Sequence, residues 1–388
     1  MTSRERVLAA CEFREPDRVP IDLGGSTGAA GIHVLAYDRL RAHLGLSHGT
    51  VTCNDLMQQL AVVEGDIRER FGLDVASVGP ACVVRDWETI PLYDNLDVRL
   101  PVGLNLRRRP NGEWFCADAG GREYRKPPNS YYFDAMDGMS WYSLGPALTD
   151  EVLADLQAYA ATLYRESDLA LCARFGGAFA SHQPQFLMDL VLEPERVEDA
   201  LARQCDSLIE KYARLHQAIG DYTFCITFAD DLGMQHSPMM APEMFAERIA
   251  PHYKRFLDWL HAKTAWKFYL HSCGAIEPLI ETLIEVGVDI LNPVQTSAQG
   301  MDPETLKRKY GGRIVFWGGG CDTQQVLGFA PPEAVAEHVR ERLAIFAPGG
   351  GFVFNQVHAI QGNVDAESIV AMLDTAREYG RYPIGGGV

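Results

Sequence analysis

Short apolar segments that alternate with amphipathic helical segments are the feature that most constrains how this chain folds. Runs rich in β-branched and aromatic residues recur along the 388 residues, and helical periodicity separates the later ones. The eight candidate strands are Val19 to Leu23, Asp74 to Val78, Ala170 to Phe175, Thr223 to Phe228, Trp266 to His271, Asp289 to Leu291, Ile314 to Trp317 and Phe352 to Asn355. Eight parallel strands close into a barrel, so the sequence predicts an α/β chain with a (β/α)8 TIM barrel.

Four helical segments in the second half of the chain support this fold. Pro242 to Lys263 has a proline in its first turn, and Ile276 to Val286 is followed by Gly287, a common helix stop. Glu333 to Phe346 and Ala366 to Tyr379 continue the alternation. Strands and helices joined in this order by short loops require right-handed parallel crossovers.

The stretch from Cys82 to Phe133 interrupts the alternation. It shows a period of two and two turn signals, Pro110-Asn111-Gly112 and Gly120-Gly121. We therefore expect an antiparallel hairpin insertion near the barrel mouth, where loops build function. No linker or internal repeat divides the chain. Residues 1–384 are predicted to form a single barrel with the insertion at residues 82–133, followed by a flexible tail at residues 385–388.

Charge and cysteine content exclude several classes of protein. The formal net charge of -17 opposes the neutralisation of phosphates, so we expect no nucleic-acid partner. No apolar stretch approaches the roughly 18 residues that cross a bilayer, and the first residues do not resemble a secretory signal, which predicts a cytoplasmic protein without membrane contact. The 9 cysteines lack framework spacing and are expected to be reduced thiols.

Candidate metal ligands follow the fifth apolar run. Because side chains alternate along a strand, His271 and Cys273 are expected to point to the same side at its carboxyl end. An imidazole and a thiolate together favour Zn²⁺, whose catalytic sites have three protein ligands and one open position. The alternative is a core histidine beside an unrelated cysteine. Further donors follow other predicted strands, Cys321 after the seventh and His358 after the eighth, and a barrel brings such ends together.

Polar side chains also follow the fourth, sixth and seventh runs. They are Asp230, Asp231, Gln235, Asn292, Gln295 and Asp322. The adjacent carboxylates Asp230 and Asp231 are candidate catalytic groups that orient a substrate or move its proton. Adjacent aspartates also cap turns, so only one of them need face the pocket. The other four side chains are predicted to bind a substrate through hydrogen bonds, with a turn as the alternative role at the Asn-Pro step.

Six segments of the second half carry a family pattern. They are FADDLGMQ, YLHSCGAIEPLI, GVDILNPVQ, GMDPETLK, FWGGGCDTQ and PGGGFVFNQVHAIQ. Together they resemble the uroporphyrinogen decarboxylase superfamily, and within it the cobalamin-dependent methyltransferase branch, over most of residues 1–384. In that branch a His-x-Cys pair and a cysteine near the last barrel loop bind zinc. His271 and Cys273 match the pair, His358 stands where those enzymes have the cysteine, and Cys321 is the alternative or additional ligand.

The resemblance to the decarboxylases of the superfamily is weaker. Those enzymes hold the carboxylates of a tetrapyrrole with an arginine-rich N-terminal segment. The corresponding stretch here, VPIDLGGSTGAAG, contains one aspartate, Asp22, and no arginine. An acidic macrocycle would find poor compensation for its buried charges, so tetrapyrrole decarboxylation is not expected.

The resemblance therefore implies a zinc-dependent methyltransferase that moves a methyl group between a small substrate and a separate corrinoid protein. The substrate would be a methyl ether, methylamine or thiol. Aromatic residues of the insertion (Trp87, Trp114, Tyr131 and Tyr132) are expected to wall the pocket, which favours O-demethylation of a methoxylated ring. Because no corrinoid-binding module is visible, the cobalamin is expected on a partner. The alternatives are a decarboxylase and a noncatalytic barrel that binds corrinoid proteins. The oligomeric state, a homodimer included, stays open.

Overall fold

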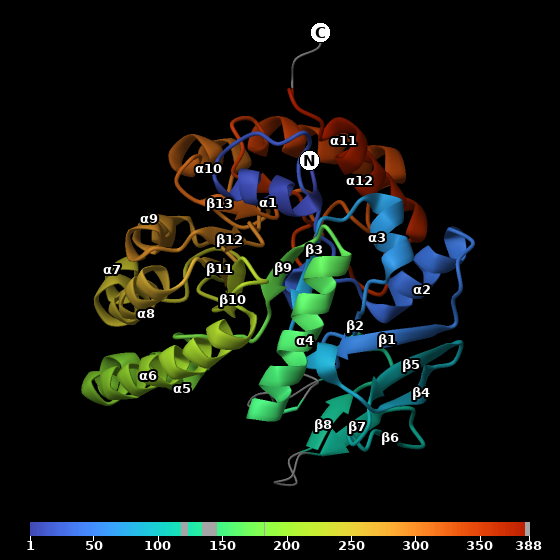
Figure 1. Cartoon of the computed structure of the whole chain (residues 1–388), viewed down its shortest axis with the longest axis horizontal. Coiled ribbons are helices and arrows are strands. Elements are labelled where there is room, and N and C mark those ends of the chain that lie inside the picture. Colours follow the sequence, from blue (N-terminus) through green and yellow to red (C-terminus); the bar gives the residue numbers. More distant parts are fainter. Residues whose placement is uncertain (118–122, 134–145, 182, 385–388) are drawn as a thin grey trace.

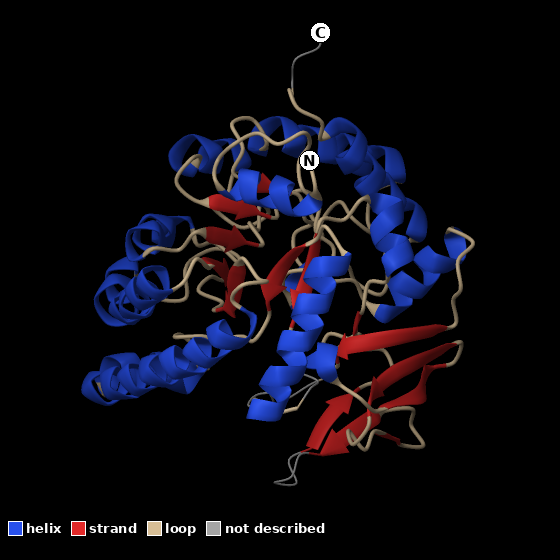
Figure 2. Cartoon of the chain, viewed as in Figure 1, coloured by secondary structure: helices blue, strands red, loops and turns tan. Residues whose placement is uncertain are grey.

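A curved parallel sheet surrounded by helices forms the centre of the molecule in the computed structural model, which describes residues 1–117, 123–133, 146–181 and 183–384 (Figures 1 and 2). Within these residues the sheet has seven strands in the order β14-β13-β12-β11-β10-β9-β3. The strands are β3 (Val75–Val78), β9 (Ala170–Ala173), β10 (Cys225–Ala229), β11 (Lys267–His271), β12 (Ile290–Asn292), β13 (Val315–Trp317) and β14 (Phe352–Val353). All neighbouring pairs are parallel, which confirms seven of the predicted strands.

The first predicted strand, Val19 to Leu23, occupies the eighth position without forming a regular strand. Ile21 makes a parallel bridge to Phe354 beyond β14, and its carbonyl accepts the main-chain N–H of Asp74 before β3 at 2.9 Å. Pro20 has no N–H to donate, and the N–H of Ile21 bonds the carboxylate of Asp74 instead of a main-chain carbonyl. The segment thus joins β14 to β3 and completes the predicted TIM barrel.

Helices cover the outer face of this sheet, as Figure 2 shows. The described helices are α1 (Ser3–Cys11), α2 (Val34–His43), α3 (Gly65–Phe71), α4 (Asp150–Glu166), α5 (Pro184–Leu192), α6 (Pro194–Ile219), α7 (Pro242–Met244), α8 (Ala250–Lys263), α9 (Glu277–Val286), α10 (Pro303–Tyr310), α11 (Pro332–Phe346) and α12 (Ala366–Tyr379). The predicted helix from Pro242 to Lys263 is divided by a π-helical turn at Phe245–Ile249. Pro251 follows that turn and cannot donate a helical hydrogen bond, which accounts for the irregularity.

Apolar side chains fill the barrel as well as the layer between the sheet and the helices. Strand residues such as Tyr269 and Trp317 face the interior, and Val7 and Ala10 of α1 pack against the same cluster. Helix α1 therefore closes the end of the barrel at which the strands begin. The opposite end, where the strands finish, stays available for polar side chains.

The predicted antiparallel insertion at residues 82–133, together with residues 50–61 ahead of it, forms two small sheets beside the barrel, at the lower right of Figure 1. Their strands are β1 (Thr50–Asp55), β2 (Leu60–Ala61), β4 (Trp87–Tyr93), β5 (Leu96–Pro101), β6 (Arg107–Arg108), β7 (Trp114–Ala117) and β8 (Glu123–Lys126). Strand β5 also pairs in parallel with β1, which the sequence analysis did not predict. The predicted turn at Gly112 joins β6 to β7, with φ at 87°, whereas Gly120-Gly121 and the tail at residues 385–388 lie outside the described residues.

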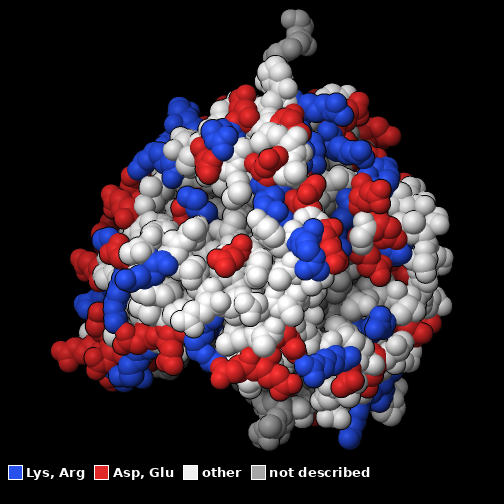
Figure 3. Space-filling view, in the orientation of Figure 1, with Lys and Arg blue, Asp and Glu red and all other residues white. Residues whose placement is uncertain are grey.

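Acidic and basic side chains are interspersed on the face of the molecule that Figure 3 shows. No helix among the described residues is both long and apolar enough to cross a membrane.

Candidate metal centre

Three predicted ligands meet at the carboxyl end of the barrel. His271 ends β11, Cys273 lies two residues further, and His358 follows β14. Their ligand atoms all lie within 4.8 Å of one another, and Nε2 of His271 is 3.4 Å from Sγ of Cys273. Donors on one tetrahedral zinc lie about 3.5 Å apart, as its bond lengths require. One thiol and two imidazoles at these separations would fit a divalent ion if the donor atoms moved slightly closer together.

The orientation of the His271 ring is fixed by Asn292 at the end of β12. The amide nitrogen of Asn292 donates to the carbonyl of Trp317 at 2.8 Å, so its amide oxygen faces His271. That oxygen is 2.6 Å from Nδ1 of His271, which therefore carries the ring proton. Nε2 is left with a lone pair that points toward Cys273. A hydrogen bond of this kind is the usual support of a metal-binding histidine.

The His358 ring is neutral but has a different hydrogen bond. Burial lowers its pKa to about 4, and the neighbouring His271 acts in the same direction. Its backbone is left-handed, with φ at 66°, and Nδ1 accepts the main-chain N–H of Ala359 at 2.8 Å. The neutral ring therefore carries its proton on Nε2. Metal binding through Nε2 would require that proton to move to Nδ1, at the expense of the bond to Ala359.

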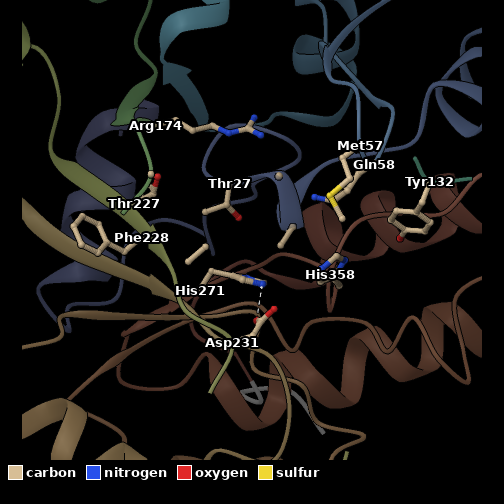
Figure 4. Close-up of a pocket in the computed structure, with 14 residues that line it drawn as sticks. Thr27, Met57, Gln58, Tyr132, Arg174, Thr227, Phe228, Asp231, His271 and His358 are labelled. Atoms are coloured by element: carbon tan, nitrogen blue, oxygen red, sulfur yellow. Dashed lines mark ion pairs between the residues drawn. The ribbon is translucent and has the colours of Figure 1, made fainter. Parts of the chain in front are cut away.

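Asp231 lies beside the three donors. Its Oδ1 is 3.6 Å from Nε2 of His271 and accepts the main-chain N–H of Cys273 at 3.0 Å (Figure 4). Burial, followed by the charge of Asp231, raises the pKa of the Cys273 thiol well above its ordinary value. A bound cation would reverse this effect, so metal binding here would release a proton.

Asp230, the other predicted catalytic carboxylate, points away from this group. It accepts the main-chain N–H groups of Phe179 at 2.6 Å and Ala180 at 3.0 Å, together with the hydroxyl of Tyr253. Burial raises its pKa to about 7. Asp230 thus ties the loop after β9 to helix α8, and only Asp231 of the pair lines the cavity.

The four predicted substrate-binding residues are hydrogen-bonded within the protein. Besides Asn292, Gln295 accepts the N–H of Gly274 at 2.8 Å and donates to Gln235 at 3.0 Å. Asp322 accepts two N–H groups of its own turn, from Gln324 and Gln325, both at 2.7 Å. None of the four lines the cavity beside the three candidate ligands.

Cys321, the alternative ligand, lies outside the group of three donors among the residues that the structure describes. Its side chain is fully buried in the apolar core, and burial raises the pKa of its thiol. The structure therefore brings His358, rather than Cys321, beside His271 and Cys273.

A cavity of about 190 Å³ opens beside His271 and His358. Asp231, His271 and His358 contribute to one part of its wall, and the remaining lining comes from residues 27–29, 57–58, 132, 174, 176 and 227–229. Of the four predicted aromatic residues, Tyr132 lines this cavity, and its hydroxyl donates to Gln361 at 2.9 Å.

Sequence reasoning missed Arg174, which follows β9 and lies across the cavity from His271 in Figure 4. The signal was an arginine inside the otherwise apolar run from Ala170 to Phe175. The other three predicted aromatic residues do not line this cavity. Trp87 lines a second cavity, Tyr131 packs against the ring of His33, and Trp114 is buried in the insertion, where its indole N–H donates to the carbonyl of Leu92 at 3.1 Å.

Comparisons with known proteins bear on the fold and the family of the chain. A methyltransferase from Methanosarcina mazei has the same fold, with a TM-score of 0.57 and 15% sequence identity over 98% of this chain and 99% of that chain. The glycoside hydrolase PbGH5A from Prevotella bryantii B14 is less similar, with a TM-score of 0.37 and 11% identity over 59% of this chain and 77% of that chain. No curated protein matches the sequence. The model of the family described as uroporphyrinogen decarboxylase (URO-D) matches residues 170–379, more than half of the chain. The chain therefore belongs to the URO-D family.

Proposed function

We propose that the protein is a zinc-dependent methyltransferase that moves a methyl group between a small substrate and a corrinoid carried by a separate protein. The observation that carries the proposal is the meeting of His271, Cys273 and His358 beside a cavity. Membership of the URO-D family and the fold shared with the Methanosarcina mazei methyltransferase support it.

The donor set suits zinc in a catalytic rather than a structural site. Three protein ligands leave one of four positions open, and a nitrogen- and sulfur-containing set favours zinc over magnesium or calcium. When bound, zinc supplies Lewis acidity to an ether oxygen or lowers the pKa of a thiol. A corrinoid on the partner would supply the cobalt that exchanges the methyl group.

Residues of the chain would prepare the substrate for this transfer. Asn292 holds the lone pair of His271 Nε2 toward the metal position. Asp231, whose Oδ1 is 3.6 Å from that nitrogen, would hold the proton that the substrate oxygen gains or loses. Tyr132, Phe228 and Met57 would enclose an apolar part of the substrate. An aromatic methyl ether, with O-demethylation as the reaction, fits these walls best.

Metal analysis of four purified proteins tests the proposal. We expect near-stoichiometric zinc in the wild type and in Cys321→Ser, and loss of zinc in Cys273→Ser and His358→Ala. Transfer of a methyl group from a methoxylated aromatic compound to a corrinoid protein should fall with the zinc content. Equal metal content in all four proteins would overturn the assignment of the centre.

A metal-independent decarboxylase is the second candidate, favoured by the hydrogen bond of His358. Because Nδ1 accepts an amide hydrogen bond, Nε2 can donate to a carboxylate without any change in the ring. This reaction predicts release of carbon dioxide from a candidate acid by a zinc-free protein. Zinc retention that depends on His358 would argue against it.

A further inference from the structure

Three buried polar side chains line the cavity without complete hydrogen bonding. They are Thr27, Gln58 and Arg174, and each is 7% exposed. Oγ1 of Thr27, Oε1 of Gln58, and Nε and Nη2 of Arg174 are buried and have no hydrogen-bond partner. Buried donors and acceptors are nearly always paired in folded proteins, so several unpaired atoms around one cavity point to a ligand.

The charge of Arg174 is only partly compensated inside the protein. Its nearest carboxylate, Asp55, lies 3.7 Å from Nη2, which is too long for a hydrogen bond. The Asp55 oxygens are engaged by Gln58 instead, through its main-chain N–H at 3.0 Å and its amide nitrogen at 3.4 Å. Arg174 therefore keeps an ion contact while two of its nitrogens, Nε and Nη2, donate no hydrogen bond.

The two unused donors lie on one edge of the guanidinium. Nε–H and one N–H of Nη2 are parallel, and this edge matches the two oxygens of a carboxylate. Gly28 keeps the approach open, because a Cβ there would lie 3.2 Å from Nη2 of Arg174, Oδ2 of Asp55 and Nε2 of Gln58. Among the described residues that line the cavity, Arg174 is the only lysine or arginine.

We infer that the cavity binds a substrate with a single carboxylate, which the Nε and Nη2 edge of Arg174 holds opposite the metal ligands. The hydroxyl of Thr27 would donate to the same carboxylate, and Oε1 of Gln58 would accept from a hydroxyl or amino group of the substrate. One guanidinium compensates one carboxylate, so a macrocycle with many carboxylates would leave the others unpaired. This inference rests on the proposed function, because it names the substrate class of the same site.

The span of the cavity suits a small molecule. The strand register places Arg174 two strands away from His271 and about two residues nearer the start of the strands. The two Cα atoms are therefore on the order of 10 Å apart. Figure 4 shows Arg174 and His271 on opposite sides of the cavity, with Thr27 between them. One substituted ring could contact the guanidinium with its carboxylate and the metal ligands with its methoxy group.

Binding measurements with matched probes test the carboxylate subsite. We would titrate the zinc-loaded protein with 2-, 3- and 4-methoxybenzoate, the corresponding neutral methoxybenzamides and 4-methoxyphenylphosphonate by calorimetry. At least one acid should bind the wild type at least tenfold more tightly than its amide. Arg174→Gln should abolish this preference while its zinc content stays close to the wild type. Arg196→Gln, an exposed arginine of α6, is the control and should retain the preference.

Three outcomes separate this subsite from the proposed function. If the preference for the acid persists in zinc-free Cys273→Ser, the subsite stands even where methyl transfer fails. If zinc is present and methyl transfer occurs but acids and amides bind equally, the subsite is wrong and the function stands. Tighter binding of the phosphonate than of every acid would also overturn the assignment to a carboxylate.

Discussion

His271 can serve as a ligand because a neighbouring amide decides which of its nitrogens carries the proton. Asn292→Ala removes the acceptor for Nδ1–H, so the ring can turn or change its tautomer. We predict that zinc affinity falls by about 10- to 100-fold, the usual cost of losing a hydrogen bond to a metal-binding histidine. Competition with a chromogenic chelator would measure the affinity.

Thr223→Val is the control for this experiment. Thr223 is also buried, and its hydroxyl accepts the indole N–H of Trp266 at 2.8 Å, at the end of the barrel where the strands begin. This variant should lose stability without a change in zinc affinity. Equal affinities for zinc in the wild type and Asn292→Ala would show that Asn292 does not orient the ligand.

The period of two along a strand was enough to predict that His271 and Cys273 converge. It could not decide between Asp230 and Asp231, because the choice depends on hydrogen-bond donors from a distant loop and from Tyr253 of α8. Nor could it predict that the side chain of Gln235 is occupied by hydrogen bonds to Gln295 and to the carbonyl of Ser297. Arg174 could not be predicted as a site residue from the sequence. The signal is that two of its buried nitrogens lack hydrogen-bond partners, and this depends on the tertiary structure.

At the scale of the element, helix α2 carries a pH-sensitive cap. Nδ1 of His33 accepts the N–H of Leu35 at 3.1 Å, and burial, followed by the charge of Lys126, lowers the pKa of His33 to about 3. Below the ordinary pKa of about 6.5 the unfolded chain binds a proton that the folded protein does not. The contribution of His33 to the unfolding free energy is therefore fully present above about pH 6.5, and it decreases as the pH falls toward 3.

His33→Asn should remove this loss and keep a capping side chain. Between pH 7.5 and pH 5, we predict that the wild type loses about 2 kcal/mol more unfolding free energy than the variant. Urea unfolding of both proteins at the two pH values measures the difference. An identical loss in both would mean that His33 is protonated in the folded protein.

Elements with strong local patterns were predictable, whereas elements that depend on distant partners were not. Helix α12 has the predicted bounds because its apolar period and Gly380 are local signals. Strand β1 was missed because its pairing with β5 joins two segments on either side of β3. The π-helical turn before Pro251 shows that helical periodicity locates a helix without revealing an interruption.

At the scale of the whole molecule, barrel closure depends on a buried carboxylate. Asp74 is fully buried at the start of β3, where Arg6 donates at 2.6 Å and Arg18 at 2.7 Å. Ser3 and the main-chain N–H of Ile21 also bond Asp74, at 2.7 Å and 2.8 Å. The N-terminal segment, which replaces the eighth strand, is thus attached to β3 chiefly through this group.

Asp74→Ala should lower the unfolding free energy by about 3–5 kcal/mol, because it leaves the buried Arg6 and the half-buried Arg18 without their shared partner. Asp155→Ala is the matched control: Asp155 bonds the exposed Arg85 at 2.6 Å, and an exposed pair contributes less than about 1 kcal/mol. Urea unfolding measures both. Because Asp74 lies at the end of the barrel opposite the metal ligands, zinc content without denaturant should match the wild type. A loss in Asp74→Ala as small as in the control would mean that apolar packing of Ile21, rather than the charge network, closes the barrel.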